Sequence, residues 1–527
     1  MSLVGAIAVV ALSGFLSLSY EILWYRAFSF TSGGAPWVFG RVLAVFLVGL
    51  AQGAFVSRSF VTASRAGDAV QQRRVVGLAV VTASMTAYLV IPGLAWLASH
   101  RAWPAGFLLV AVAAFVMGLV LPVVSHLGID PDSRVGARLS YLYLASVLGS
   151  ALGCLLTGFV LSDLWSLETI SIVLALTGVV LGVALSLDAV RISMPSIGVA
   201  GAMRGVRTLA AITVVAIAAI ELHRPLFANV YERLLYKDQA SSRPPFAEVV
   251  ETRGGVVAVT GDRVVYGGGI YDGMIETDLV RDENLLVRAY ALAGMHPRPA
   301  RILMIGLGTG AWATALLQLP GVVRLTAVEI NAGYLPIIAR HAEVSGVLSD
   351  PRVSIVIDDG RRWLAQNPNE RFDAIVMNTT WYWRAHSTNL LSNEFMQLAR
   401  RHLDNGGILY FNSTWSPDAM KTGMSAFPYG LRCVNFIALS DAPIQFDSAR
   451  WGSFLRDFRR SDGRLVFDGG PNSSSARLDS LLAFGRSING APVSYGLEQR
   501  ASVLKRVADA HIITDDNMRV EWRATSP

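Results

Sequence analysis

The chain has few cysteines and few charged residues. Two cysteines, Cys154 and Cys433, occur in 527 residues, and neither belongs to a Cys-x-x-Cys pair or a cysteine–histidine cluster. This scarcity gives no support to a disulfide framework or a zinc site, and we predict no metal ligands. Only 16% of the residues are charged, whereas soluble globular chains carry about 25%. The composition is therefore not that of an ordinary soluble protein.

The apolar excess lies almost wholly before residue 222. Hydrophobic residues make up 53% of the chain, and the mean hydropathy is +0.45. A membrane-spanning helix needs roughly 20 mostly apolar residues. We therefore predict an α-helical transmembrane bundle of about seven helices, in a multi-pass protein of a bacterial-type inner (plasma) membrane that has the lipid bilayer as a partner. The segments that satisfy the length and composition are 3–23, 38–57, 76–98, 104–126, 139–161, 167–187 and 206–222.

The basic residues of this half lie mainly in short loops, which argues against nucleic acid as a partner despite a pI of 9.4. An excess of arginine in loops marks the cytoplasmic side of a membrane, and seven crossings would then place the C-terminal half outside. A cofactor made in the cytosol argues for the reverse, and we expect the soluble domain to be cytoplasmic. The loop arginines are Arg58, Arg65, Arg73, Arg74, Arg134, Arg138, Arg191, Arg204 and Arg207.

Glu21 and Arg26 are ionisable residues close to membrane depth. Such residues are costly in lipid and are usually paired or functional. They could form a buried ion pair that includes Arg41, contact a lipid headgroup or substrate, or mark the interface beside the aromatic anchors Trp24 and Tyr25.

The rest of the chain reads as soluble. We divide the sequence into a transmembrane domain (1–222), a connector with a small β meander (223–299), a Rossmann-like α/β domain (300–441) and a C-terminal extension (442–527). In the α/β domain, strands alternate with helices, a pattern that predicts a parallel sheet with ligands at the carboxyl ends of its strands. The predicted strands are 247–251, 256–259 and 263–266 in the meander, then 301–305, 323–330, 353–357, 372–377 and 407–411.

Three groups of residues follow the first three strands of the α/β domain: a glycine loop, then a glutamate, then a pair of aspartates. Glycine lets the backbone approach a ligand closely, and a helix start offers free N–H groups; a carboxylate after the second strand can bind ribose hydroxyls. A further carboxylate after the third strand can accept a hydrogen bond from an adenine amino group. Together they predict a nucleoside cofactor, and a G-x-G-x-G loop suits S-adenosylmethionine or a derivative better than a nicotinamide dinucleotide. The residues are Gly306, Gly308, Thr309 and Gly310, then Glu329, then Asp358 and Asp359.

From about residue 247 to 440 the sequence resembles the spermidine synthase (polyamine aminopropyltransferase) family. The resemblance implies a class I S-adenosylmethionine-dependent transferase fold and decarboxylated S-adenosylmethionine as the cofactor. The apolar half is similar to membrane segments fused to this domain in many bacterial proteins, through Tyr20-Glu21-x-x-Trp24-x-Arg26 and Gly118-x-x-Leu121-Pro122. The soluble half matches through Tyr271-Asp272-Gly273, Arg281-Asp282-Glu283, the glycine loop, Val328-Glu329-Ile330, Asp350-Pro351-Arg352-Val353, Asp359-Gly360-Arg361, Phe372-Asp373-Ala374-Ile375-Val376 and Asn393-Glu394-Phe395.

The sequence departs from this family where the family holds its amine substrate. Thr309 occupies the place of the loop aspartate, and Asn378-Thr379-Thr380-Trp381 stands where an Asp-x-x-Asp segment is expected. The Tyr-His pair that follows Asp-Glu is missing, and the family glutamine is replaced by Glu276. A diamine is a dication, and carboxylates are needed to bind it and to leave one amine neutral. We therefore predict that ordinary diamine chemistry is lost.

The replacing residues predict another kind of substrate pocket. An aromatic and cationic pocket suits an apolar or anionic acceptor. His386 is the best candidate for a base near neutral pH, Glu276 and Asp272 are further candidate acids, and Asn378 stands at the catalytic position. The predicted pocket residues are Trp381, Tyr382, Trp383 and Arg384.

The leading hypothesis is a membrane-bound transferase that uses S-adenosylmethionine or its decarboxylated form. It would transfer a methyl, aminopropyl or aminocarboxypropyl group to a small-molecule or lipid acceptor that is membrane-associated or not a diamine. A true polyamine aminopropyltransferase with relocated acids is one alternative, and a non-catalytic sensor or transporter that binds a nucleoside or polyamine is another. A homodimer is compatible with each of them.

Overall fold

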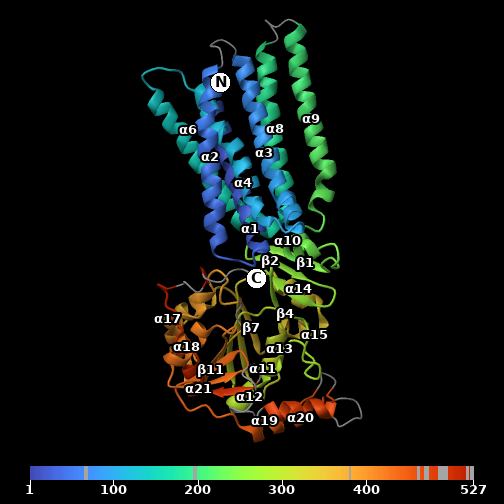
Figure 1. Ribbon diagram of the computed structural model, residues 1–527, viewed down its shortest axis with the longest axis vertical. Coiled ribbons are helices and arrows are strands. Elements are labelled where there is room, and N and C mark those ends of the chain that lie inside the picture. Colours follow the sequence, from blue (N-terminus) through green and yellow to red (C-terminus); the bar gives the residue numbers. More distant parts are fainter. Residues whose placement is uncertain are drawn as a thin grey trace. The chain divides into compact units, whose positions relative to one another are not determined.

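The computed structural model describes residues 1–63, 69–193, 199–378, 381–459, 463–467, 474–484, 496–517 and 521–522. The chain forms two compact units. The first contains Met1–Ser32, Trp37–Phe246 and Glu251–Gly255, and the second contains Gly33–Pro36, Ala247–Val250 and Val256–Pro527. Figure 1 shows the helical first unit in blue to green and the α/β second unit in green to red.

The first unit consists of long apolar helices. Among the described residues, seven stretches of helix are long and apolar enough to cross a membrane, which confirms the prediction of about seven long apolar helices. The helices α4 and α5 together make one candidate span, and α6 continues through a π-helical turn, η2, into α7. The elements are α1 (Leu3–Thr31), α2 (Trp37–Ala63), α3 (Ala69–Ser99), η1 (Trp103–Ala105), α4 (Gly106–Gly118), α5 (Val120–Gly128), α6 (Val135–Leu156), η2 (Thr157–Leu161), α7 (Ser162–Leu164), α8 (Leu167–Ser193), α9 (Val199–Phe227), α10 (Val230–Tyr236) and η3 (Lys237–Gln239).

Small residues bring α6 close to α1. A side chain at Gly149 would collide with the carbonyl of Ala11, and one at Gly153 would collide with the carbonyl of Phe15. Close backbone approach of this kind is typical of helices that associate in lipid.

The ionisable residues of α1 have partners other than those considered from sequence. Arg26 donates to the carbonyl oxygen of Thr252 at 2.9 Å and lies 3.9 Å from the carboxylate of Glu251. The guanidinium of Arg41 lies 4.2 Å from the ring of Trp37. An ion pair among Glu21, Arg26 and Arg41 is therefore wrong, because Arg26 binds Glu251 and Thr252 instead.

The second unit begins with a four-stranded sheet in the order β1-β2-β3-β4. Its strands are β1 (Glu248–Thr252), β2 (Gly255–Val259), β3 (Val264–Gly267) and β4 (Ile270–Met274). The predicted meander therefore gains a fourth strand. Two short helices, α11 (Val287–Tyr290) and α12 (Leu292–Met295), follow the sheet.

An eight-stranded mixed sheet forms the centre of this unit, in the order β12-β10-β11-β9-β8-β5-β6-β7. The five strands predicted from sequence are present and pair in parallel, and three antiparallel strands extend the β9 edge. The strands are β5 (Arg301–Ile305), β6 (Arg324–Glu329), β7 (Val353–Ile357), β8 (Phe372–Met377), β9 (Leu403–Asn412), β10 (Tyr429–Cys433), β11 (Phe436–Ser440) and β12 (Leu497–Gln499). The fold is therefore the predicted helical bundle followed by an α/β domain.

The remaining helices of the second unit connect or cover these strands. They are α13 (Ala311–Leu317), α14 (Tyr334–Arg340), α15 (Ala342–Ser345), η4 (Gly346–Leu348), α16 (Gly360–Gln366), η5 (Ser387–Leu390), α17 (Asn393–Arg401), α18 (Pro417–Ala426), α19 (Ser448–Arg456), α20 (Ser474–Phe484) and α21 (Arg500–Arg506).

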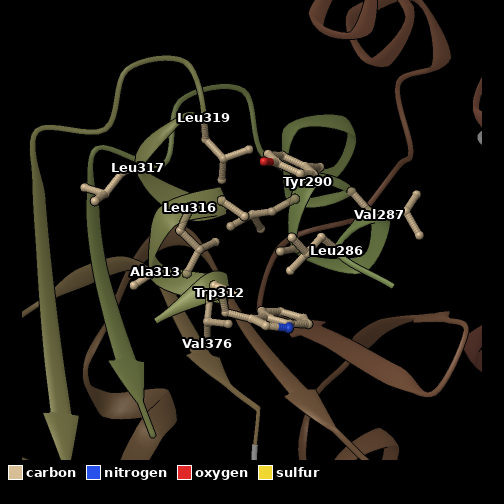
Figure 2. Close-up of a cluster of buried hydrophobic side chains, with 14 of the residues drawn as sticks. Leu286, Val287, Tyr290, Trp312, Ala313, Leu316, Leu317, Leu319 and Val376 are labelled. Carbon is tan, nitrogen blue, oxygen red and sulfur yellow. The ribbon is translucent and has the colours of Figure 1, made fainter. Parts of the chain in front are cut away.

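Apolar side chains bury both faces of the central strands. Along β5, Ile302 and Met304 belong to one buried cluster, and Leu303 and Ile305 belong to another. Figure 2 shows part of the first cluster, in which Trp312 of α13 lies close to Val376 of β8. Strands buried on both faces are typical of doubly wound sheets. This packing fixes the start of α13, directly after the glycine loop.

Candidate functional site

The glycine loop joins β5 to α13 in a conformation that requires glycine. Gly306, Gly308 and Gly310 have φ angles of +87°, +51° and +79°. L-amino acids with side chains rarely adopt this left-handed region. The intervening backbone N–H groups of Leu307 and Gly308 are thereby turned toward β6.

Glu329, at the end of β6, receives these N–H groups. Its Oε2 accepts from Leu307 at 2.7 Å and from Gly308 at 3.0 Å, and its Oε1 accepts from Asn331 at 2.8 Å. Burial raises the pKa of Glu329, and the three backbone donors act in the opposite direction. A carboxylate has about four acceptor positions. Glu329 therefore shapes the loop and still has capacity at Oε1 for one more donor, such as a ribose hydroxyl.

The two aspartates after β7 have local partners. Asp359 caps α16, because its Oδ1 accepts from the backbone N–H of Arg362 at 2.8 Å. Asp358 accepts from the Nε of Arg362 at 2.6 Å, and its own N–H donates to the carbonyl oxygen of Glu329 at 3.0 Å. These contacts fix both residues beside the glycine loop and Glu329. The adenine contact stays a prediction.

Asp272 of β4 lies beside the loop and is half-buried among polar neighbours. Its Oδ2 accepts a hydrogen bond from the hydroxyl of Tyr334, the first residue of α14. Burial raises the pKa of Asp272, whereas Tyr334 and the guanidinium of Arg384 lower it. The adjacent Gly273 brings β4 within van der Waals reach of the Thr309 methyl group. Asp272 and Thr309 therefore share one side of the site.

The segment that follows β8 packs against the Gly33–Pro36 loop within the second unit. The N–H of Ala385 donates to the carbonyl oxygen of Gly34 at 2.9 Å. Trp383 is buried with its ring against Gly33, and Arg384 lies against Gly34. Gly33 and Gly34 have φ angles of +67° and +79°. This loop thus positions two of the predicted pocket residues.

Amide side chains occupy the carboxyl end of β8. Asn412 donates to the Oδ1 of Asn378 at 3.1 Å and accepts from Asn435 at 2.7 Å. Asn435 in turn accepts from Arg288 at 2.9 Å. Asn378, at the place of the first aspartate that the resemblance implies, therefore belongs to a chain of uncharged amides that ends on a guanidinium. Residues 379 and 380 of the same segment lie outside the described residues.

The segment from Trp381 to Leu390 is held by a residue close to the C-terminus. Glu521 accepts from the backbone N–H of His386 at 3.1 Å and from the N–H and hydroxyl of Thr388 at 2.8 and 2.6 Å. The ring of Trp381 is 38% exposed, and the N–H of Tyr382 donates to the hydroxyl oxygen of Thr414 at 3.2 Å. His386 is exposed, and its imidazole makes no hydrogen bond to any residue that the structure describes. No hydrogen bond joins the imidazole of this candidate base to Asp272 or Glu329.

Glu276 is buried close to the end of β4. Its Oε1 accepts from the N–H of Asp278 at 2.5 Å and lies 3.9 Å from Arg281, whereas its Oε2 has no hydrogen-bond partner among the described residues. A carboxylate oxygen without a donor in a buried place is costly. Glu276 therefore has an acceptor available for a ligand. No group of three or more potential metal ligands occurs in the described part of the chain.

Several residues of the site were not predicted from the sequence. Tyr334 and Arg288 lie outside every motif, and Asn412 and Asn435 come from strands far along the chain. Arg361 makes a bidentate ion pair with Asp515 at 2.8 and 2.6 Å. This pair anchors α16, which is capped by Asp359, to the C-terminal segment. Of these residues only Arg361 stands in a motif named from the sequence, Asp359-Gly360-Arg361.

Comparison with known proteins agrees with this geometry. Residues 290–421 match the spermine/spermidine synthase domain family. The polyamine aminopropyltransferase of Korarchaeum cryptofilum is 26% identical over 37% of this chain and 64% of its own length. Polyamine aminopropyltransferase 1 of Pseudomonas aeruginosa is 34% identical over 26% of this chain and 49% of its own length. The chain thus spans less than two thirds of either relative.

Two solved structures were also matched. Spermidine synthase from Thermotoga maritima is 21% identical over 43% of this chain and 84% of its own, with a TM-score of 0.31. A spermidine synthase in complex with the transition state analogue AdoDATO is 20% identical over 45% of this chain and 87% of its own, with a TM-score of 0.32.

The strand–loop–helix geometry around Glu329 belongs to an α/β domain with a mixed eight-stranded sheet. Within this domain, residues 290–421 are similar to the spermine/spermidine synthase domain, and the curated relatives matched by this half of the chain are polyamine aminopropyltransferases.

Proposed function

We propose that this protein is a membrane-bound transferase that binds an S-adenosyl nucleoside and passes one of its alkyl groups to an acceptor that is not a free diamine. Decarboxylated S-adenosylmethionine is the first candidate donor, because the related proteins are aminopropyltransferases. The observation that carries the proposal is the Glu329 carboxylate, which organises the glycine loop and retains one acceptor position. Intact S-adenosylmethionine is the second candidate, because Thr309 would not repel its carboxylate.

The charge distribution supports an acceptor other than a diamine. Asn378 is neutral and belongs to a chain of amides that ends at Arg288. Asp272 is engaged by Tyr334 and lies near Arg384. A buried dication without paired carboxylates is expensive. An uncharged or anionic acceptor, including a lipid headgroup, fits these residues better.

The chemistry is an in-line displacement. An acceptor lone pair forms a bond to the carbon next to the sulfonium, the carbon–sulfur bond breaks, and its electron pair stays on sulfur as a neutral thioether. The proton of the acceptor goes to Asp272, whose raised pKa makes its carboxylate a better base than an ordinary aspartate. His386 is the second candidate base. The protein otherwise contributes by positioning the two reactants.

The apolar helices are proposed to hold the domain at a bilayer, with the domain on the cytoplasmic side, where the cofactor is made. Seven crossings place the two ends of the chain on opposite sides. A reporter that is active only in the cytoplasm, fused after Pro527, tests this orientation. Activity of a periplasmic reporter at the same position would contradict it.

Product analysis tests the function. Purified protein is incubated with either donor and a membrane lipid extract, and nucleoside products are followed by mass spectrometry. Methylthioadenosine is expected from the decarboxylated donor and marks propyl transfer, whereas S-adenosylhomocysteine from the intact donor marks methyl transfer. Absence of both products, with saturable donor binding that Glu329→Ala abolishes, would favour a sensor instead.

A true polyamine aminopropyltransferase is the second candidate, and the curated relatives favour it. In that case Glu276, with its available Oε2, would replace a missing acid. Methylthioadenosine release with putrescine that Glu276→Gln abolishes would support it.

A further inference from the structure

The helical unit contains a cavity of about 460 Å³. Side chains from α1, α2, α3, α4, α5 and α6 line it, and all of them belong to the first unit. Ligand sites in proteins usually measure about 300–1,000 Å³ and are mostly apolar with a few placed polar groups. The volume is therefore sufficient for a small ligand and much larger than a gap left by ordinary packing.

The cavity wall is uncharged. None of its lining residues, each of which the structure describes, is acidic or basic. A polyamine or another dication would need carboxylates in such a place, because a buried unpaired charge is very costly. The wall thus excludes the charged molecules that the α/β domain's relatives are named for, and it does not fit a polyamine transport path.

Serine hydroxyls are the polar groups of the wall. Ser84, Ser146 and Ser150 line the cavity, and their hydroxyl groups form no hydrogen bond within the described residues. Ser84 is only 3% exposed. Hydroxyl groups in an apolar setting gain stability when they find an acceptor. These serines are suited to a ligand that carries an ester or hydroxyl oxygen.

The cavity is open on its α2 and α6 sides. Ala51 and Ala54 of α2 and Tyr143 of α6 line it and are exposed. The neighbouring outer faces carry exposed apolar side chains, such as Phe55 and Val147. A helical surface of this kind faces hydrocarbon when the bundle is in a bilayer. The opening is therefore accessible from lipid.

We propose that this cavity binds an uncharged lipid, with a hydrocarbon chain against the apolar wall and an ester or hydroxyl oxygen at the serines. The proposal uses the proposed membrane insertion and does not depend on transferase activity. A diacylglycerol has this chemistry, and its photoreactive analogue is a suitable probe.

The test is photolabelling of the full chain in lipid nanodiscs by a diacylglycerol that carries a diazirine in one acyl chain. Labelled peptides should come from the cavity-lining parts of α1, α2, α3 and α6. Ala51→Phe, which fills the opening, should lower labelling at least about fivefold, because added bulk in a packed site is poorly tolerated. The matched control is Ala151→Phe, on the exposed side of α6 outside the cavity, which should leave labelling unchanged.

A second variant separates binding from misfolding. Ser84→Ala should lower labelling by the diacylglycerol about threefold, as expected for one lost hydrogen bond, and should not alter labelling by a plain hydrocarbon diazirine. Equal labelling of all helices, insensitive to Ala51→Phe, would overturn the proposal and leave a water-filled cavity. Stronger labelling of the cavity by a photoreactive spermine would overturn it in favour of transport.

Discussion

The two halves of the site in the α/β domain differ in how closely they follow the spermidine synthase pattern. On the cofactor side, the glycines, Glu329 and Asp359 are present; Glu329 binds the glycine loop, and Asp359 caps the helix that follows β7. On the acceptor side, acids give way to Asn378 and Trp381, and the remaining Asp272 is engaged by Tyr334. The difference teaches that a domain can keep the geometry for a shared nucleoside while the acceptor chemistry changes.

The largest effect is expected on the cofactor side. Glu329→Ala removes the acceptor of three backbone N–H groups and the place for a ribose hydroxyl. Hydrogen bonds to a charged group contribute about 1.5–3 kcal/mol each, so donor binding should weaken on the order of a thousandfold. Isothermal titration calorimetry with methylthioadenosine measures this. The control is Glu343→Ala, which removes a surface partner of Arg263. Equal affinity of the two variants would contradict a role of Glu329 in donor binding.

The acceptor side should respond in rate rather than in donor affinity. Asp272→Asn removes the proposed base and should lower kcat about a hundredfold, the lower range for general base catalysis, with an unchanged dissociation constant for the donor. Because the pKa of Asp272 is raised, wild-type kcat should rise with pH along an acidic limb above about pH 4. The variant should lack this limb. An unchanged pH profile would give Asp272 a positioning role only.

A buried acid outside the two halves of the site, Asp282, should act on stability. The pKa of Asp282 is raised from 3.8 to about 6, because its burial outweighs the nearby Arg477. Because the folded-state pKa is raised, protonated Asp282 stabilises the fold below pH 4, and this stabilisation is lost as the pH rises through about 6. The loss in the free energy of unfolding amounts to about 3 kcal/mol. The melting temperature of wild type should therefore fall relative to that of Asp282→Asn as the pH is raised from 4 to 6, because the variant has no acid to ionise. Parallel melting curves for the two proteins would contradict this.

Restoring an acid on the acceptor side should bring back part of the activity toward a diamine. Asn378→Asp places a carboxylate at the end of β8, where the family has one, and should increase methylthioadenosine release with putrescine about tenfold, the effect of about 1.4 kcal/mol. The matched control is Asn367→Asp at the end of α16, outside the site. No gain at position 378, or an equal gain in both, would show that charge at this place does not select the acceptor.

The sequence predicts the parts of the fold that depend on local pattern. Apolar runs of spanning length and strand–helix alternation led to all seven long helices and all five parallel strands. The fourth meander strand was missed, because Ile270–Met274 contains a glycine and an aspartate and lacks a clear alternation. Strand β12 was missed because three residues carry too weak a pattern, and its place is fixed by pairing with β10.

The candidate site shows the same limit. Glu329 and the glycine loop follow strands in sequence, so their proximity could be predicted from the strand order of a parallel sheet. Arg288, Asn435 and Tyr334 meet the site only through tertiary packing, and no local spacing indicates this. His386 was favoured for its side-chain chemistry alone. Its imidazole is exposed and makes no hydrogen bond to any described residue.

The most direct test of the central claim is a comparison of acceptors with one donor. Methylthioadenosine release from decarboxylated S-adenosylmethionine is measured with putrescine and with membrane lipid extract, using the wild-type full chain in nanodiscs. We expect release with the extract and none above background with putrescine, and the release with the extract should be abolished in Glu329→Ala. Efficient release with putrescine alone would contradict the claim that the acceptor side has changed.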